Sequence, residues 1–122
     1  VSHHIGRDIR FLPHVAAFFR GISLTVAAEL MNGWTETELL TLYREFYSGN
    51  ALIKVQKKIP EVIKVRDSHM LTIGGFSVSE ANPTRISLVA VLDNLLKGAA
   101  TQAVQNLNLA FGLDSMTGLN TQ

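Results

Sequence analysis

The sequence predicts an α+β domain in which helices cover one face of a mixed, mainly antiparallel sheet. Three observations predict it: strand-like apolar patterns in residues 22–30, 71–78 and 85–92, helical spacing in 34–47 and 95–111, and the order of the segments. With two further short strands, that order is strand, strand, helix, strand, strand, strand, helix, which is typical of the α+β class. The 122 residues, 47% of them hydrophobic, suffice for one domain over 1–122.

Composition excludes several functional classes. A formal net charge of +1 gives no electrostatic case for nucleic acid as a partner. The chain has no cysteine, and therefore no disulfide, thiolate metal site or cysteine nucleophile of its own. Its most apolar window, Val15 to Met31, is interrupted by Arg20 and Glu29, so we expect no membrane span. Because the chain begins at Val1 without an initiator methionine, we expect it to be a piece of a longer protein.

Two strands are expected in the first third of the chain. Ile9 to Leu12 predicts a short strand that ends at Pro13. In the second, apolar and mostly polar or small residues alternate with a period of two, which predicts one buried face. The apolar positions of this second strand are Ile22, Leu24, Val26, Ala28 and Leu30.

The first helix carries signals at both of its ends. Thr35 and Glu38 have the spacing of a capping box, and Trp34 and Leu39 that of a hydrophobic staple. Gly49 is a plausible stop residue, and a short strand over Leu52 to Val55 follows. One face of this helix is expected to be apolar, and it carries Leu39, Tyr43, Phe46 and Tyr47.

The remaining strands are predicted to pair. Leu71 to Val78 alternates, but its phase slips at Gly74 and Gly75, where a bulge or the close approach of another backbone would explain both glycines. Asn82 and Pro83 turn the chain. Arg85 to Leu92 then returns as a buried strand, which predicts an antiparallel pair.

The most informative segment is the start of the last helix, Asp93–Ala100. Asp93 or Asn94 can cap the helix by accepting hydrogen bonds from its free N–H groups. Gly98 in an early turn costs about 1 kcal/mol relative to alanine, so something is expected to pack closely there. Sequence leaves two readings open: another backbone or a flat ligand, against an ordinary capped helix with a small-residue packing face. The helix is expected to end at Gly112.

His14 and Arg20 are the remaining candidates for chemistry. His14 follows Pro13 at a predicted strand end, and Arg20 stands six residues later beside Gly21. An imidazole and a guanidinium there could line an anion site, although a loop histidine and a surface arginine explain the spacing as well. The adjacent pair His3 and His4 lacks the partners of a zinc site, so no metal site is expected.

Two segments together resemble N-acetyl-gamma-glutamyl-phosphate reductase. Asp93–Ala100, continuing to Asn106, is similar to that family's C-terminal helix, and Phe11–Val15 with Phe19–Ile22 is similar to its P-H-L motif followed by R-G-I. The resemblance covers residues 5–119. A helix start of this kind also occurs in the related aspartate-semialdehyde dehydrogenases, but these carry R-V-P and G-H in the strand where this chain has Pro13-His14 and Arg20-Gly21.

The resemblance implies a part of an NADPH-dependent enzyme of arginine biosynthesis. Such enzymes reduce the acyl phosphate N-acetyl-gamma-glutamyl phosphate to the semialdehyde, through a thioester on a cysteine. The nucleotide-binding half, the cysteine and the catalytic histidine would lie upstream of Val1. This chain would then be most of the C-terminal substrate and dimerisation domain, with a fold like that of glyceraldehyde phosphate dehydrogenase, and inactive alone.

The resemblance also implies roles for individual residues. His14 and Arg20 would lie near the substrate, and Asn94 and Gly98 near the nicotinamide of NADP. The domain would form a homo-oligomer through its sheet, in the cytoplasm, or in the mitochondrial matrix if the parent is a fungal bifunctional chain. The alternatives are a non-catalytic interaction module of the same fold and a piece of an aspartate-semialdehyde dehydrogenase.

Overall fold

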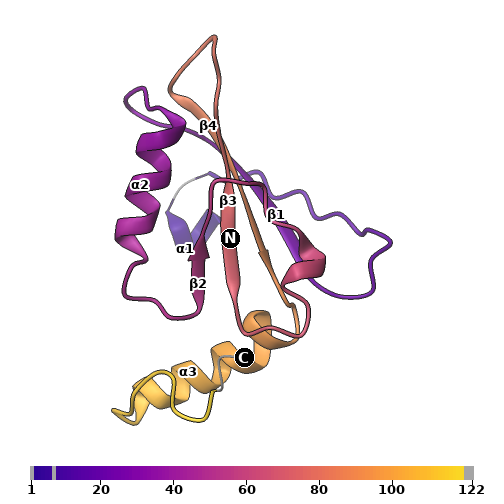
Figure 1. Ribbon diagram of the computed structural model, residues 1–122. Helices are drawn as coiled ribbons and strands as arrows, with labels where there is room; N and C mark the ends of the chain where they lie inside the picture. The colour runs from indigo at the N-terminus through magenta and orange to yellow at the C-terminus, as the bar shows by residue number, and fades with distance from the viewer. Residues whose placement is uncertain (1, 7, 120–122) are drawn as a thin grey trace.

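A four-stranded sheet forms the centre of the protein in a computed structural model, which describes residues 2–6 and 8–119 (Figure 1). The strand order is β1-β4-β3-β2. β4 is antiparallel to both β1 and β3, while β2 runs parallel to β3, which confirms the predicted mixed, mainly antiparallel sheet. The strands span β1 (Ile22–Glu29), β2 (Ile53–Val55), β3 (Leu71–Val78) and β4 (Arg85–Leu92).

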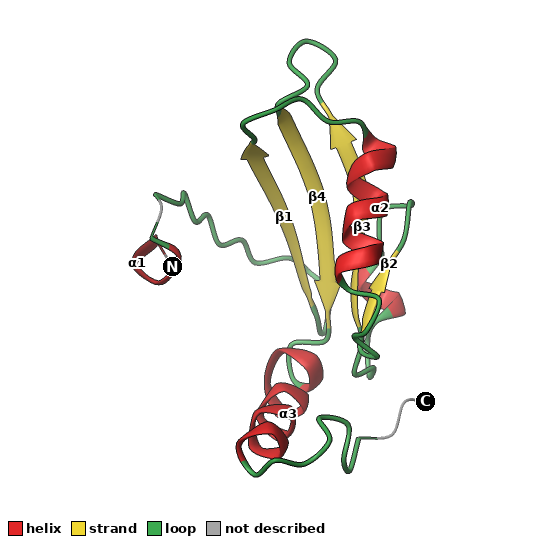
Figure 2. Ribbon diagram, turned by 90° about the vertical axis from the view of Figure 1, so that its left-hand side faces the viewer, coloured by secondary structure: helices red, strands yellow, loops and turns green. Residues whose placement is uncertain are grey.

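Helix α2 (Glu36–Phe46) covers one side of the sheet over β3 and β2 (Figure 2). It begins with the predicted capping box, because Thr35 Oγ1 accepts the Glu38 N–H and Glu38 Oε2 accepts the Thr35 N–H. The core lies beneath it and joins Leu39 to strand residues Ile73, Phe76, Ile86 and Leu88. Tyr43 and Tyr47 of the predicted apolar face pack against this core, whereas Phe46, at the end of the helix, is 74% exposed.

Both explanations offered for Gly74 and Gly75 are confirmed. The register of β3 against β4 shifts between Gly74 and Ser77. A Cβ at Gly74 would collide with the carbonyl oxygens of Lys58 and Gln56, which belong to the segment that leaves β2. Gly75 adopts a φ of 63°, which favours glycine. A bulge and a close backbone approach therefore occur at the same place.

β1 differs from the prediction, because all eight of its residues are exposed. The strand is at the edge of the sheet, and α2 lies over the other edge (Figure 2). The alternation is real: Leu24 and Val26 pair with Ala90 and Leu88, so they face the same side as the core. No element of the described chain covers that part of this side.

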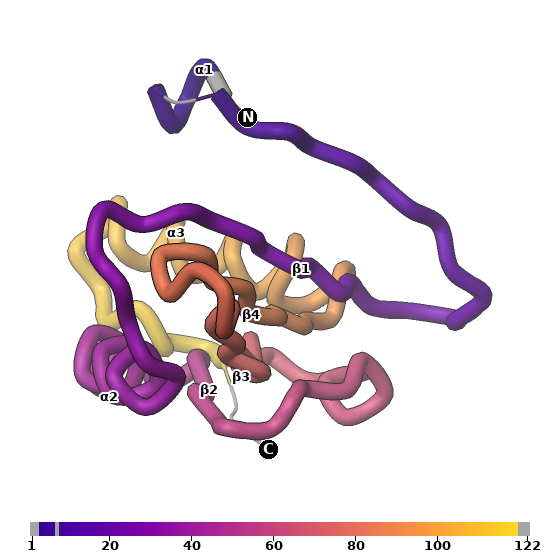
Figure 3. Tube along the Cα trace, turned by 90° about the horizontal axis from the view of Figure 1, so that it is seen from above, coloured from indigo at the N-terminus to yellow at the C-terminus, as the bar shows by residue number. Residues whose placement is uncertain are grey.

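A long arm, residues 8–20, precedes β1 and leads away from the sheet (Figure 3). The strand predicted for Ile9 to Leu12 is absent: these residues lie in the arm and are not part of the sheet. The short helix α1 (Ser2–Ile5) stands before the arm and contains His3 and His4. The arm is rich in exposed apolar side chains, namely Phe11, Leu12, Val15, Phe18 and Phe19.

The last helix begins directly after β4 and lies across the end of the sheet (Figures 1 and 2). A π-helical turn, η2 (Leu96–Ala100), leads into α3 (Thr101–Ala110). Gly112, with a φ of 68°, follows the helix as predicted. A short 3-10 helix, η1 (Val62–Lys64), lies between β2 and β3. No helix in the described ranges is long and apolar enough to cross a membrane.

Candidate functional site

Asp93, directly after β4, is the centre of a network of hydrogen bonds and an ion pair. Its side chain is fully buried. Oδ1 accepts the N–H groups of Leu95 and Leu96 at 2.9 Å each. Of the two residues predicted to cap the helix, Asp93 is therefore the one that does so. Oδ2 accepts the Asp67 N–H at 2.8 Å and lies 2.7 Å from Arg20 Nε. One carboxylate thus joins three segments of the chain.

Opposing influences act on the pKa of Asp93. Burial raises the pKa of this carboxyl, whereas hydrogen bonds from the Leu96 and Asp67 N–H groups, the contact with Arg20 and the Leu95 N–H lower it. The lowering influences dominate, so the pKa of Asp93 lies below its usual range. The carboxylate is therefore charged at neutral pH and holds its donors as an anion.

Arg20 is held by two carboxylates. Its Nη1 donates to Asp67 Oδ1 at 2.9 Å, and its Nε lies 2.7 Å from Asp93 Oδ2, although it is not aligned there as a hydrogen-bond donor. The side chain is 18% exposed. Asp67 adopts a left-handed φ of 60°, which brings its N–H and its carboxylate to the two partners. The arm is thereby fixed where it enters β1.

Asn94 does not cap the helix; it contacts Gly21, the residue between the arm and β1. Its Oδ1 accepts the Gly21 N–H at 2.8 Å. Because an N–H can bond only to the oxygen of the amide, this contact also fixes the orientation of the Asn94 amino group. Gly21 must be small, since its φ is 122° and a Cβ there would collide with the Val62 side chain. Two adjacent residues, Asp93 and Asn94, thus hold the two adjacent residues Arg20 and Gly21.

The close packing expected at Gly98 occurs within the chain. A Cβ at this position would lie 3.0 Å from Leu92 Cδ1 and 3.3 Å from the Asp93 carbonyl oxygen. The Gly98 N–H donates to that same oxygen at 2.8 Å, an i to i−5 bond of the π-turn. Both contacts come from Leu92 and Asp93, which immediately precede the turn, so they do not decide between the two predicted partners, another backbone and a flat ligand. π-Turns of this kind are frequent at functional sites.

His14 stands apart from the other three candidate residues. It is exposed on the arm and forms no hydrogen bond or ion pair with Arg20, Asn94 or Gly98 in the described ranges. Arg20 and Asn94 do meet, through Gly21 and Asp93. Within residues 2–6 and 8–119, no three His, Asp or Glu side chains group closely enough to hold a metal ion.

Sequence reasoning missed several participants. The turn that contains Asp67 and His69 is not among the residues that the sequence predicts for the site. Asp67 binds Arg20 instead, and the half-buried His69 pairs its Nδ1 with the hydroxyl of the buried Thr101 at 2.7 Å. The one local signal was an aspartate in a turn, a residue type that tolerates left-handed backbone. Nothing local pointed to partners 26 to 47 residues away.

The arrangement supplies a rigid, polar corner at the end of the sheet. In the described chain, the amino group of Asn94 has no hydrogen-bond partner, whereas its oxygen has one. Such an amide can donate to an acceptor on a ligand, in a direction that Gly21 fixes. Among the described residues of the corner, the carboxylates of Asp93 and Asp67 are both paired with Arg20, and the chain has no cysteine thiol that could attack a substrate.

Comparison with known proteins identifies relatives for nearly the whole chain. A family model described as semialdehyde dehydrogenase, dimerisation domain, matches residues 2–94. The chain is 46% identical to the bifunctional protein argC, mitochondrial, of Dictyostelium discoideum over 100% of its own length and 14% of that protein. It is 45% identical to N-acetyl-gamma-glutamyl-phosphate reductase of Xanthomonas campestris pv. campestris, over 98% of the chain and 37% of that protein.

Solved structures show the same fold. Aspartate semialdehyde dehydrogenase II of Vibrio cholerae superposes with a TM-score of 0.63 at 22% identity, over 77% of this chain and 28% of that one. A probable aspartate-semialdehyde dehydrogenase of Pseudomonas aeruginosa gives 0.62 at 24% identity, over 78% and 29%. The chain thus spans 14% to 37% of the length of these relatives.

Proposed function

The chain belongs to the family of semialdehyde dehydrogenase dimerisation domains, and from that premise we propose that it is the C-terminal domain of an N-acetyl-gamma-glutamyl-phosphate reductase. The observation that carries the proposal is the 44% to 46% identity to the bifunctional protein argC and to named N-acetyl-gamma-glutamyl-phosphate reductases, across 98% to 100% of the chain. The likeness to aspartate-semialdehyde dehydrogenases, at 22% to 24% identity, supports the fold alone.

In the whole protein, the reaction would be the NADPH-dependent reduction of N-acetyl-gamma-glutamyl phosphate to the semialdehyde. Residues 1–122 would form a single domain, and the nucleotide-binding part with the nucleophilic cysteine would precede it. The absence of cysteine here means that this domain needs that part for activity. The word mitochondrial in the relative's name supports the mitochondrial matrix for a bifunctional parent; for a single-function parent we propose the cytoplasm.

The domain's contribution would be to position ligands. Bound NADPH would supply the hydride. The residues present fit its nicotinamide carboxamide: Asn94 has an unpaired amino group whose direction Gly21 fixes, and Gly98 carries no side chain that would obstruct an approach. In this chain's own residues, Asn94 would orient the ring by donating to the carboxamide oxygen, and Asp93 would keep Asn94 in place.

His14 and Arg20 are proposed for the substrate side. His14 is free of partners in the described chain and can donate or accept a hydrogen bond. The guanidinium of Arg20 has its Nε and Nη1 engaged by Asp93 and Asp67, so only its remaining amino group, Nη2, would face a phosphate or carboxylate. Arg20 would thus contribute a donor whose charge is largely compensated.

The domain would also form a homodimer through its sheet. The exposed apolar side chains of β1 on the core side, Ile22, Leu24 and Val26, support this, since a second copy would remove them from water. We name these three residues the β1 strip. The family's description as a dimerisation domain agrees with such an interface.

The test is an assay of the intact protein for NADPH oxidation that depends on the acyl phosphate. Asn94→Asp keeps an oxygen for the Gly21 N–H but removes the amino group, so we expect the Michaelis constant for NADPH to rise about tenfold or more, as expected for the loss of one hydrogen bond and a new negative charge. Asn106→Asp, on an exposed part of α3, is the matched control.

No substrate-dependent oxidation by the wild-type protein would overturn the proposed reaction. A normal Michaelis constant in Asn94→Asp with an active enzyme would instead remove Asn94 from the cofactor site and leave the reaction standing.

A further inference from the structure

A cavity of about 620 Å³ lies between α3, the loop that leads into β2, and the C-terminal turn. It is apart from the corner at Asp93 and Asn94, neither of which lines it. Its lining comes from residues 49–53, from one side of the last helix and from 114–116. The size falls within the range of small-molecule sites in proteins, about 300–1,000 Å³.

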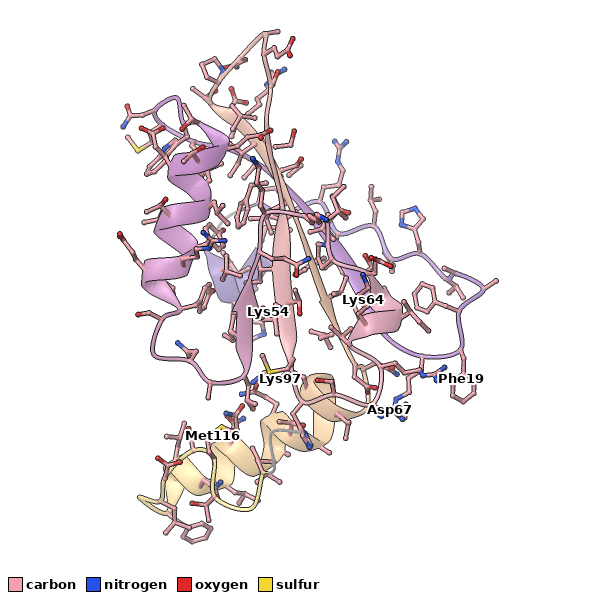
Figure 4. The ribbon with its side chains drawn as sticks, in the orientation of Figure 1. Phe19, Lys54, Lys64, Asp67, Lys97 and Met116 are labelled. Atoms are coloured by element: carbon pink, nitrogen blue, oxygen red, sulfur yellow. The ribbon has the colours of Figure 1, made fainter. Side chains whose placement is uncertain are left out.

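Among the residues that the structure describes, Lys97, labelled in Figure 4, is the one cation in the lining of this cavity. Its Nζ donates to Gln105 Oε1 at 2.6 Å and to Gln102 Oε1 at 3.1 Å, and both acceptors are neutral amides. In the described chain no carboxylate lies within ion-pair distance of it. By contrast, Lys64 pairs with Glu61 at 2.5 Å. An ammonium has three donors, so one of those on Lys97 remains for a further acceptor.

The surroundings of Lys97 disfavour an unpaired charge. The residue is half-buried, and its desolvation lowers the pKa of the ammonium. A partly buried cation that meets only amides lacks the compensation that an anion would give. The two glutamines hold the ammonium in place, and Gln105 is held in turn by Met116 Sδ at 3.9 Å. The cation is therefore positioned in advance, which reduces the entropy lost on binding a ligand.

The acidic residue of the lining, Asp114, does not compensate the charge. Its Oδ1 accepts the Met116 N–H at 2.8 Å and so closes the C-terminal turn, and the residue is exposed. Its presence sets a limit on the ligand, because a highly charged anion would be repelled by it. Asn50 and Ser115 add neutral polar groups to the lining.

We propose that this cavity binds a small molecule through an anionic oxygen group, a carboxylate or a phosphate, that pairs with Lys97. The site is distinct from the proposed substrate and cofactor positions and does not depend on the proposed reaction. The same chemistry could be offered by a phosphate ester or by an organic acid, and separate probes distinguish them.

The experiment is isothermal titration calorimetry of the intact protein with sodium phosphate and, separately, with sodium succinate, at constant ionic strength. Hydrogen–deuterium exchange with and without each anion locates the binding. Lys97→Gln removes the charge, Lys97→Arg keeps it, and Lys54→Gln on the exposed face of β2 is the matched control.

We expect saturable binding of at least one probe and protection of the amides in 49–53 and 114–116. Lys97→Gln should raise the Kd about tenfold or more, the expected effect of losing one charge-assisted hydrogen bond, while Lys54→Gln leaves it within about twofold. Lys97→Arg should stay within about threefold of the wild type. Tighter binding of succinate than of phosphate would indicate that the ligand is an organic acid. Tighter binding of phosphate would indicate a phosphate ester.

Three results would overturn the proposal. The first is failure of both anions to bind. The second is protection from hydrogen–deuterium exchange that is confined to segments outside the cavity, which is measured on the wild-type protein and needs no variant. An equal Kd in Lys97→Gln and Lys54→Gln would show that binding is independent of Lys97.

Discussion

The two halves of the sheet contrast sharply in burial. On one side, β3, β4 and α2 enclose a core in which Leu39 is 1% exposed and Ile73 5%. On the other side, every residue of β1 is exposed, although its strand pairs with β4 along its entire length. Backbone pairing is complete in both halves, so the difference lies in what covers the side chains.

The contrast shows that pairing and burial are separate requirements of a strand. β1 satisfies its inward backbone groups on β4, yet its apolar side chains remain in water. Burying apolar area is worth about 25 cal/mol per Å², so an uncovered strip is a free-energy reserve that association can use. The arm, which immediately precedes β1 in the sequence, adds further exposed apolar residues.

The largest effect is expected in the core. Leu39→Ala should lower the free energy of unfolding by about 3 kcal/mol, because it removes methylene groups from a fully packed site and leaves a cavity. Leu24→Ala, the same change on β1, should lower it by less than about 1 kcal/mol in the monomeric protein. Urea unfolding followed by circular dichroism measures both. Equal losses at the two positions would contradict the contrast between the halves.

The next effect concerns the link between the halves, since Asp93 joins the end of the arm to the packed side. Asp93→Asn removes the charge that faces Arg20 and places an amino group against either the Asp67 N–H or the N–H groups of Leu95 and Leu96. It should cost on the order of 2 kcal/mol at neutral pH. Asp67→Asn is the control, because its side chain is 65% exposed and such ion pairs contribute about 1 kcal/mol or less.

This link should also depend on pH in a definite direction. The folded pKa of Asp93 is lowered from 3.8, so its contribution is present above the unfolded pKa and is lost as the pH falls through the folded pKa. The stability difference between wild type and Asp93→Asn should therefore be constant near neutrality and shrink below about pH 4. Denaturant midpoints at several pH values measure it, and a difference that grows in acid would contradict the assignment.

Much of the packed half could be predicted from the sequence because its signals are local. The capping box at Thr35 and Glu38, the glycine pair in β3 and the strand of Arg85 to Leu92 each follow from residues a few positions apart. Asp93 could be recognised as a cap for the same reason. The α+β class and the mixed sheet followed from the order of these elements.

The exposed half could not be predicted in the same way. Alternation fixes which side chains of β1 share a face but not whether anything covers that face, so the predicted burial was wrong. In the arm, the apolar run Ile9 to Leu12 resembles a strand, yet it is not one of the four strands of the sheet. The contacts of Arg20 with Asp67 and Asp93 span 47 and 73 positions, and no local pattern encodes them.

The central claim is that a second copy of the protein covers the β1 strip, and sedimentation equilibrium tests it most directly. Val26 and Thr25 are adjacent and both exposed, but Val26 faces the core side with Leu88 whereas Thr25 faces the opposite side with Val89. Val26→Lys places a charge in the proposed interface and should raise the dimer dissociation constant by at least about tenfold, while Thr25→Lys should leave it unchanged. A wild-type protein that stays monomeric would contradict the account. Equal dimer dissociation constants for the two variants would contradict it as well.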